Sequence, residues 1–353
     1  MENANLDPKK AADPRPQTDR RLWTDFLLNY SLYIILGLMI VVVIIINPAF
    51  LSLTNFTKIL TQASTRGILA LGLAGMIVLA GTDLSAGRIL GCCAAVTASL
   101  VQSVTYTSRM YPNIESDLPV LVPLALSIAI AVAFCLLNGF GVAKLHLHAF
   151  IITLGTQLIA FGALCIYIDS QKGGAQALSS FNPTFLNVVN GGFKIGGFTL
   201  PFLIIYFLIA AACMWVIWNK TALGKNMFAI GGNMEAAAVS GVNVTRNIMG
   251  VYLIAGVLYG CAAFLEAGRV QSVNTGMGLN YELDAISGCV IGGVSFSGGV
   301  GTIPGVVIGV IILQTINFCL SYLSVNPYLQ YIIKGLIIIL AVSIDVRKYL
   351  SKK

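Results

Sequence analysis

Long apolar stretches separated by short polar connections dominate this chain. A helix that crosses a bilayer needs about 20 mainly apolar residues. Stretches of suitable length lie at 30–47, 88–108, 119–143, 149–168, 200–218, 247–266, 301–321 and 328–346. The pattern therefore predicts an all-α, polytopic membrane protein whose helix bundle occupies residues 30–346.

Two further apolar stretches, 67–80 and 284–296, are shorter and rich in glycine. Each ends in a glycine-rich, turn-prone segment, residues 81–87 after the first and 295–301 after the second. Helices that break inside a membrane have this pattern, because their freed backbone groups must face protein or water. We therefore expect about ten transmembrane segments, two of them short or broken, with eight as the minimum.

Basic residues at the two ends of the chain predict its orientation. Five Lys or Arg residues lie within 1–29, and further ones lie within 347–353. Cytoplasmic segments of membrane proteins carry an excess of these residues. Ten crossings place both tails and the loop 219–246 in the cytoplasm, and they place the acidic loop 109–118 outside.

Composition supports the membrane assignment and limits the partners. Charged residues make up 10% of the chain and hydrophobic residues 57%, whereas soluble domains contain about 25% charged residues. The net charge is +7, and the basic residues lie in the tails and loops. They do not form a basic stripe interspersed with aromatic residues, which is typical of nucleic-acid-binding proteins. We therefore expect lipid and not nucleic acid as a partner. The cysteines form no Cys-x-x-Cys pair, and His146 and His148 have no further ligand nearby, so no metal site is expected.

The loop 219–246 contains a sequence typical of a short capped helix. Asn233 suits the N-cap and Glu235 the first turn, where the helix dipole favours a negative charge. Alanines follow at 236–238, and Gly241 suits the left-handed position after the last turn. We predict a helix of about two turns, which needs docking onto its own subunit or a partner to be stable.

The same residues carry a resemblance. Glu235, Ala236 and Ala237, followed by Gly241, resemble the EAA loop of ATP-binding-cassette importer permeases. From Tyr30 to Lys348 the chain is similar to the permeases of monosaccharide importers, the family that includes the ribose, xylose and galactose systems. The stretches that carry this similarity are 81–88, 138–139, 150–156, 218–244, 265–269, 281–302 and 326–335.

The resemblance implies a permease subunit in the bacterial plasma membrane that carries a monosaccharide into the cytoplasm. Within the family the likeness is greatest to galactose and methyl galactoside systems, so these sugars are the expected cargo. It also implies a permease homodimer, a cytoplasmic ATPase that binds the ATP, and an extracytoplasmic sugar-binding protein. The residues expected to couple the chain to the ATPase are Asn233, Glu235, Ala236, Ala237 and Gly241.

The chain itself lacks the motifs of an ATPase or another enzyme. Gly224 and Lys225 are followed by Asn226, and Asn219 stands where a phosphate-binding loop has its first glycine. We therefore expect no cofactor and no catalytic activity. A self-contained sugar facilitator or secondary transporter is the alternative. The scarcity of charges within the spans argues against an ion-coupled transporter but not against a passive facilitator.

Polar residues within the spans are candidates for the translocation pathway, although they could equally bond helix to helix. Asp83 has two interpretations, since it could line the pathway or cap the helix that follows it, and capping is the favoured one. The candidates are Asp83, Asn138, Thr156, Gln157, Asn274, Gln314 and Asn317.

Overall fold

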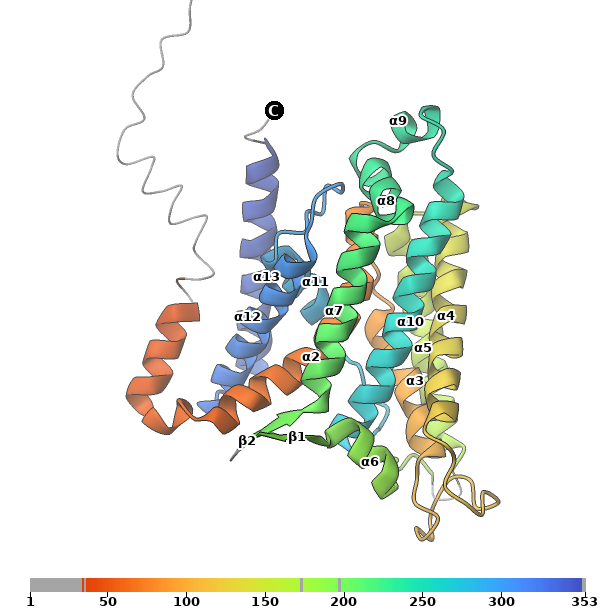
Figure 1. The fold of residues 1–353 in the computed structure, drawn as a ribbon, viewed down its shortest axis with the longest axis vertical. Coiled ribbons are helices and arrows are strands. Elements are labelled where there is room, and N and C mark those ends of the chain that lie inside the picture. The colour runs from red at the N-terminus through yellow and green to blue at the C-terminus, as the bar shows by residue number, and fades with distance from the viewer. Residues whose placement is uncertain (1–33, 35, 172–173, 196–197, 351–353) are drawn as a thin grey trace, which may run out of the picture.

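The computed structural model describes residues 34, 36–171, 174–195 and 198–350, which form a bundle of helices with one small β-hairpin (Figure 1). Among these residues the first helix is apolar and runs over Leu36–Ile46. The elements that follow it are η1 (Pro48–Phe50), α2 (Leu53–Val78), α3 (Ala86–Leu100), α4 (Leu121–Ala143), α5 (Ala149–Asp169), α6 (Pro183–Asn190), β1 (Gly192–Ile195), β2 (Phe198–Pro201), α7 (Phe202–Lys220), α8 (Ala222–Gly232), α9 (Met234–Val239), α10 (Val244–Val270), α11 (Tyr281–Ile291), α12 (Ile303–Tyr322) and α13 (Pro327–Leu350).

A helix lies at each of the ten predicted apolar stretches, which confirms the helical, multi-pass character of the chain. Among the described residues, α4, α5, α7, α10 and α12 are long and apolar enough to cross a membrane. Their outward side chains are apolar and exposed, as at Leu158 (67%) and Ile166 (74%) on α5. In a membrane, lipid covers such an apolar surface, whereas exposing it to water would be unfavourable. The number of ten crossings remains a prediction.

The prediction of a short helix at 67–80 was wrong. This stretch is the C-terminal part of α2, which has 26 residues and begins after Ser52. The first half of α2 is polar, so the hydropathy pattern did not predict that the helix begins there. The Thr57 hydroxyl donates to the carbonyl of Leu53, and the Thr61 hydroxyl donates to the carbonyl of Thr57, one turn earlier in each case. A hydroxyl bonded in this way can be accommodated within a helix.

The predicted short helix at 284–296 is confirmed by α11, which has 11 residues, and α3, with 15 residues, is a further short apolar helix. α3 was expected to extend to residue 108 but ends at Leu100. The side chain of Gln102 binds the amide of Met110 and the carbonyl of Ser179, so the chain folds back after α3. The β1–β2 hairpin, paired from Gly192↔Pro201 to Ile195↔Phe198, is a small exception to the all-α prediction.

The two ends of the bundle carry different elements (Figure 1). α8, α9 and the C-terminal end of α13 lie at one end, whereas α6, the β-hairpin and the connection between α3 and α4 lie at the other. This arrangement agrees with the predicted separation of loop 219–246 from loop 109–118. The tail 1–29 lies outside the described residues, and α13 continues to Leu350, so the predicted C-terminal tail begins within this helix. The cytoplasmic position of both tails remains a prediction.

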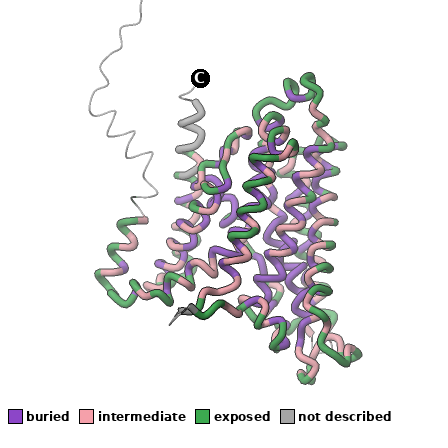
Figure 2. Tube along the Cα trace, viewed as in Figure 1, coloured by how far each residue is buried: buried purple, intermediate pink, exposed green. Residues whose placement is uncertain are grey.

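Close packing against α10 forms the centre of the bundle, and Figure 2 shows buried residues on the inner faces of the helices. α10 approaches α4 through glycines: a Cβ at Gly256 would lie 2.6 Å from the Cα of Val132, and one at Gly260 would overlap Ile128. Small residues permit this backbone-to-backbone contact in membrane bundles, where dispersion forces replace the hydrophobic effect.

Candidate functional site

The loop 219–246 forms two helices, α8 and α9, where the sequence predicted one. α8 begins after Thr221, whose hydroxyl accepts a hydrogen bond from the amide of Gly224 at 3.3 Å. The signal that could have revealed α8 is the helical spacing of Leu223, Met227 and Ile230 behind this cap.

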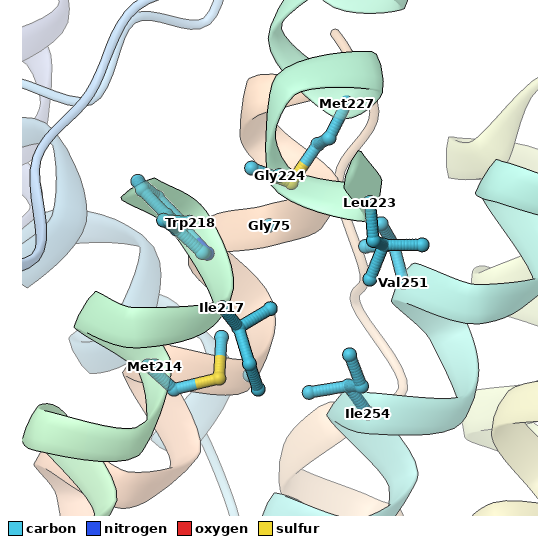
Figure 3. Close-up of a pocket in the computed structure, with 10 residues that line it drawn as sticks. Gly75, Met214, Ile217, Trp218, Leu223, Gly224, Met227, Val251 and Ile254 are labelled. Atoms are coloured by element: carbon cyan, nitrogen blue, oxygen red, sulfur yellow. The ribbon is translucent and has the colours of Figure 1, made fainter. Parts of the chain in front are cut away.

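α8 is anchored on the bundle by its apolar side chains (Figure 3). Met227 and Leu223 meet an apolar pocket between α2, α7 and α10. Phe228 packs edge-to-face on Trp218 of α7, with ring centroids 5.3 Å apart. The other helices contribute Gly72, Gly75, Met214, Ile217, Trp218, Val251 and Ile254 to the pocket. α8 therefore contacts three helices of the bundle at once.

α9 has the caps that the sequence predicted. The side chain of Asn233 accepts a hydrogen bond from the amide of Ala236 at 2.9 Å. Gly241 has a φ of +85°, and the amide of Val242 donates to the carbonyl of Ala237 at 3.0 Å, which closes the C-terminus in a Schellman-like turn. The helix has six residues, Met234–Val239, in agreement with about two turns.

α9 presents mainly small and apolar side chains to the surroundings. Val239 is 90% exposed and Met234 47% exposed, and Ala236 and Ala238 are exposed as well. Glu235 is also exposed and forms no ion pair with another described residue. α9 thus projects from the end of the molecule with an apolar tip (Figure 1).

A buried polar network surrounds the interruption between α2 and α3. Asp83 is completely buried and accepts hydrogen bonds from the amide of Ser85 at 2.8 Å and from the hydroxyl of Tyr259 at 3.2 Å. The amide of Asn138 donates to the Ser85 hydroxyl at 2.9 Å, and the Thr156 hydroxyl donates to Asn138 at 2.6 Å. The network joins the interruption to α4, α5 and α10. The favoured prediction that Asp83 caps α3 was wrong, because the N-cap of this helix is Ser85 and no side chain caps it. The Asp83 carboxylate instead accepts from the amide of Ser85 just before the helix and from Tyr259 of α10.

The remaining pathway candidates lie apart from this network. Gln157 is half-buried on α5, and Asn274 is exposed between α10 and α11, where its side chain accepts from the amide of Gly276 at 2.9 Å. Gln314 and Asn317 are buried together on α12, with 3.5 Å between the Asn317 amide nitrogen and the Gln314 oxygen. The structure thus brings together Asp83, Asn138 and Thr156 but not the others.

We expect Asp83→Ala to destabilise the protein by about 2 kcal/mol or more, because at least two buried donors lose their acceptor and each orphaned group costs about 1–3 kcal/mol. Asp83→Asn keeps a side-chain oxygen and is expected to lose less. Thermal unfolding in detergent measures both, with Asn274→Ala as the exposed control. Equal stability of Asp83→Ala and the unchanged protein would contradict the structural role of this network.

A cluster of charged residues is a second polar feature, and it starts at Glu266 of α10. Glu266 is completely buried and accepts two hydrogen bonds from Arg269, at 2.7 and 2.6 Å. The hydroxyls of Thr65 on α2 and Tyr281 on α11 each donate to it at 2.7 Å. Four hydrogen bonds therefore satisfy a carboxylate that would otherwise be costly inside the bundle.

Asp284 extends this cluster to α13. Its carboxylate pairs with Arg66 of α2 and with Lys334 of α13, the latter at 3.1 Å. The Arg66 guanidinium also lies 4.2 Å from the ring centroid of Tyr281. Arg66 was not among the predicted site residues, although a cation at the edge of an apolar stretch can indicate such a site. The charges join α2, α10, α11 and α13. Among the described residues, no group of three or more His, Cys, Asp or Glu could hold a metal ion.

Comparison with known proteins places the chain in a family. The family model described as "Branched-chain amino acid transport system / permease component" matches residues 55–342. The galactose/methyl galactoside import permease proteins MglC of Escherichia coli and Haemophilus influenzae are both 47% identical to the chain. The alignment with the first covers 95% of this chain and 99% of the relative, and that with the second covers 93% and 97%.

More distant relatives are ribose permeases. The ribose import permease protein RbsC of Bacillus subtilis is 34% identical over 89% of this chain and 92% of its own length. No solved structure matches the chain. The match to the family model and the near full-length similarity to sugar permeases lead to one conclusion: this chain belongs to the family of import permeases that are the membrane components of transport systems.

Proposed function

We propose that this chain is the permease subunit of an ATP-binding-cassette importer that carries galactose or methyl galactoside across the bacterial inner membrane into the cytoplasm. The 47% identity to two permeases named for these sugars supports the choice of cargo over ribose, since the ribose permease is 34% identical. The energy comes from ATP bound by a separate ATPase, and an extracytoplasmic sugar-binding protein delivers the sugar. Two copies of the permease form the pore.

The observation that carries this proposal is the exposed apolar tip of α9. Exposed apolar surface at a membrane protein's polar end favours a protein partner, because lipid does not cover it there. Val239 is 90% exposed, while α8 beneath it is anchored on α2, α7 and α10. A partner that grips α9 can therefore pull on the bundle. We assign this partner as the ATPase.

The proposed coupling residues have different tasks. Asn233 and Gly241 shape the ends of α9, and Glu235 and Ala236 are exposed for contact with the ATPase. Ala237 is 5% exposed, so it supports α9 from within the subunit.

For the pathway, Gln314 and Asn317 are the strongest candidates. The Gln314 amide nitrogen and the Asn317 oxygen are buried and have no hydrogen-bond partner among the described residues. Together they offer a donor and an acceptor to a hydroxylated solute. Gln157 and Asn274 are secondary candidates, and Asp83, Asn138 and Thr156 act mainly by holding the interruption before α3.

Reconstitution into liposomes tests the function. We expect the permease, together with its ATPase and binding protein, to accumulate radiolabelled galactose against its gradient only when ATP is supplied. Unlabelled methyl galactoside is expected to compete more strongly than ribose. Accumulation by this chain alone under an ion gradient would show a secondary transporter, and equilibration of galactose by this chain alone would show a facilitator. Either result would contradict the proposal.

A further inference from the structure

The C-terminal end of α8 contacts the backbone of two distant segments. A Cβ at Gly231 would overlap the carbonyl oxygen of Val78, at the end of α2, and would lie 2.7 Å from the amide nitrogen of Gly299. A Cβ at Gly298 would lie 2.5 Å from the Gly231 carbonyl oxygen and 2.9 Å from the Cβ of Ala80. Three stretches of main chain therefore meet here with no room for a side chain.

The two segments at this junction are the interruptions of the bundle. One follows α2 and leads into α3, and the other follows α11 and leads into α12. They are also joined to each other, because the amide of Gly299 donates to the carbonyl of Val78 at 2.8 Å. Asp83, with its network to α4, α5 and α10, lies in the first interruption, shortly after Ala80.

Backbone contact of this kind transmits displacement with little loss. Side chains can absorb a movement by changing rotamer, but packed main chains cannot, and close-packed interiors pass strain on. Gly231 belongs to the same helix as Met227, which anchors α8 on the bundle, and it comes just before α9. A movement of α9 thus has a direct route to both interruptions.

We propose that the junction of Gly231 with Val78–Ala80 and Gly298–Gly299 is the point at which movement of α8 and α9 shifts both interrupted segments together and so switches access to the pathway. This inference rests on the proposed function, in which an ATPase moves α9. It assigns a role to residues that do not touch the ATPase or the sugar.

Gly231→Ala tests the junction, with Gly232→Ala as its matched control. A Cβ at Gly232 meets nothing within 4 Å, so the same substitution one residue later is free of overlap. Alanine favours a helix over glycine at both positions, so a defect at Gly231 cannot come from a weaker α8. In liposomes with the complete importer, we expect galactose uptake per ATP hydrolysed to fall about tenfold for Gly231→Ala, within the usual range of coupling between sites. Gly232→Ala should stay within about twofold.

A second matched pair tests the junction from the other side. Gly299 has a φ of +68° and a Cβ there would lie 2.9 Å from the Gly232 backbone, whereas Gly293 has a φ of +82° and open space around it. Alanine strains the backbone at both positions, but only Gly299→Ala should uncouple ATP hydrolysis from galactose uptake. This second pair also tests the inference if the Gly231→Ala protein fails to accumulate in the membrane. Equal transport per ATP within each pair would overturn the inference. The proposed function is tested separately, by co-purification of the ATPase with the permease and by ATP-driven uptake in the unchanged importer. If both are observed, equal transport within each pair would contradict only the role of the junction.

Discussion

Glu266→Ala is expected to reduce the amount of folded permease in the membrane more than any other single substitution considered for this protein. The carboxylate is completely buried and accepts hydrogen bonds from Arg269, Thr65 and Tyr281. Its removal leaves the Arg269 guanidinium, which is only 21% exposed, without its counter-charge. Breaking a buried ion pair on one side costs about 3–5 kcal/mol, a large share of the stability of a typical protein.

The double variant Glu266→Ala/Arg269→Ala separates the loss of the pair from the burial of an unpaired charge. We expect it to be more stable than Glu266→Ala alone, because the uncompensated cation is gone as well. Thermal unfolding in detergent and the amount of monodisperse protein measure this, with the exposed Glu115→Ala as control. A Glu266→Ala protein as stable as the unchanged one would mean that the charged cluster does not hold α2, α10 and α11 together.

Glu235→Lys is expected to abolish ATP-driven galactose uptake while the permease still folds and inserts. Glu235 is exposed, makes no ion pair with another described residue and lies in the first turn of α9. The substitution should therefore reduce the stability of the folded permease only by the lost interaction of Glu235 with the helix dipole, which is about 0.3–1 kcal/mol. In the contact with the ATPase, by contrast, the new lysine reverses a charge at the centre of the proposed interface, and such changes cost several kcal/mol.

Co-purification of the ATPase with the tagged permease is the direct measurement for Glu235→Lys, and uptake into liposomes is the second. Glu115→Lys makes the same change on an exposed residue at the opposite end of the molecule, in the connection between α3 and α4. It should retain the ATPase. If Glu235→Lys binds the ATPase and transports galactose as well as Glu115→Lys does, α9 is not the coupling element.

The five long apolar helices were predictable from the sequence, because each is long and apolar enough to cross a membrane without a break. They are continuous apolar stretches, because every face of each helix contacts either the protein interior or lipid. These helices are α4, α5, α7, α10 and α12. The ends of α9 were predictable as well, since Asn233 and Gly241 act through their own neighbouring backbone. α2 was misjudged because its first half carries hydroxyls that are satisfied locally.

The sites that join distant segments were not predictable in the same way. The candidates Asp83, Asn138 and Thr156 were proposed one by one, but no spacing in the chain indicates that one chain of hydrogen bonds connects them. Arg66 was overlooked, because its importance comes from Asp284, which lies more than two hundred residues later and becomes its partner only in the folded bundle.

The sequence by itself determined that this is a multi-pass helical membrane protein, that a capped helix would form within residues 219–246, and which family the chain resembles. These properties depend on hydropathy and on contacts between near neighbours in the chain, which do not change with the tertiary fold. Only the tertiary structure decided that the ionisable residues pair with each other across helices and that Gly231 meets Val78 and Gly299. The reason is that backbone packing and buried hydrogen bonds depend on which surfaces meet in space, and this depends on all the helices at once.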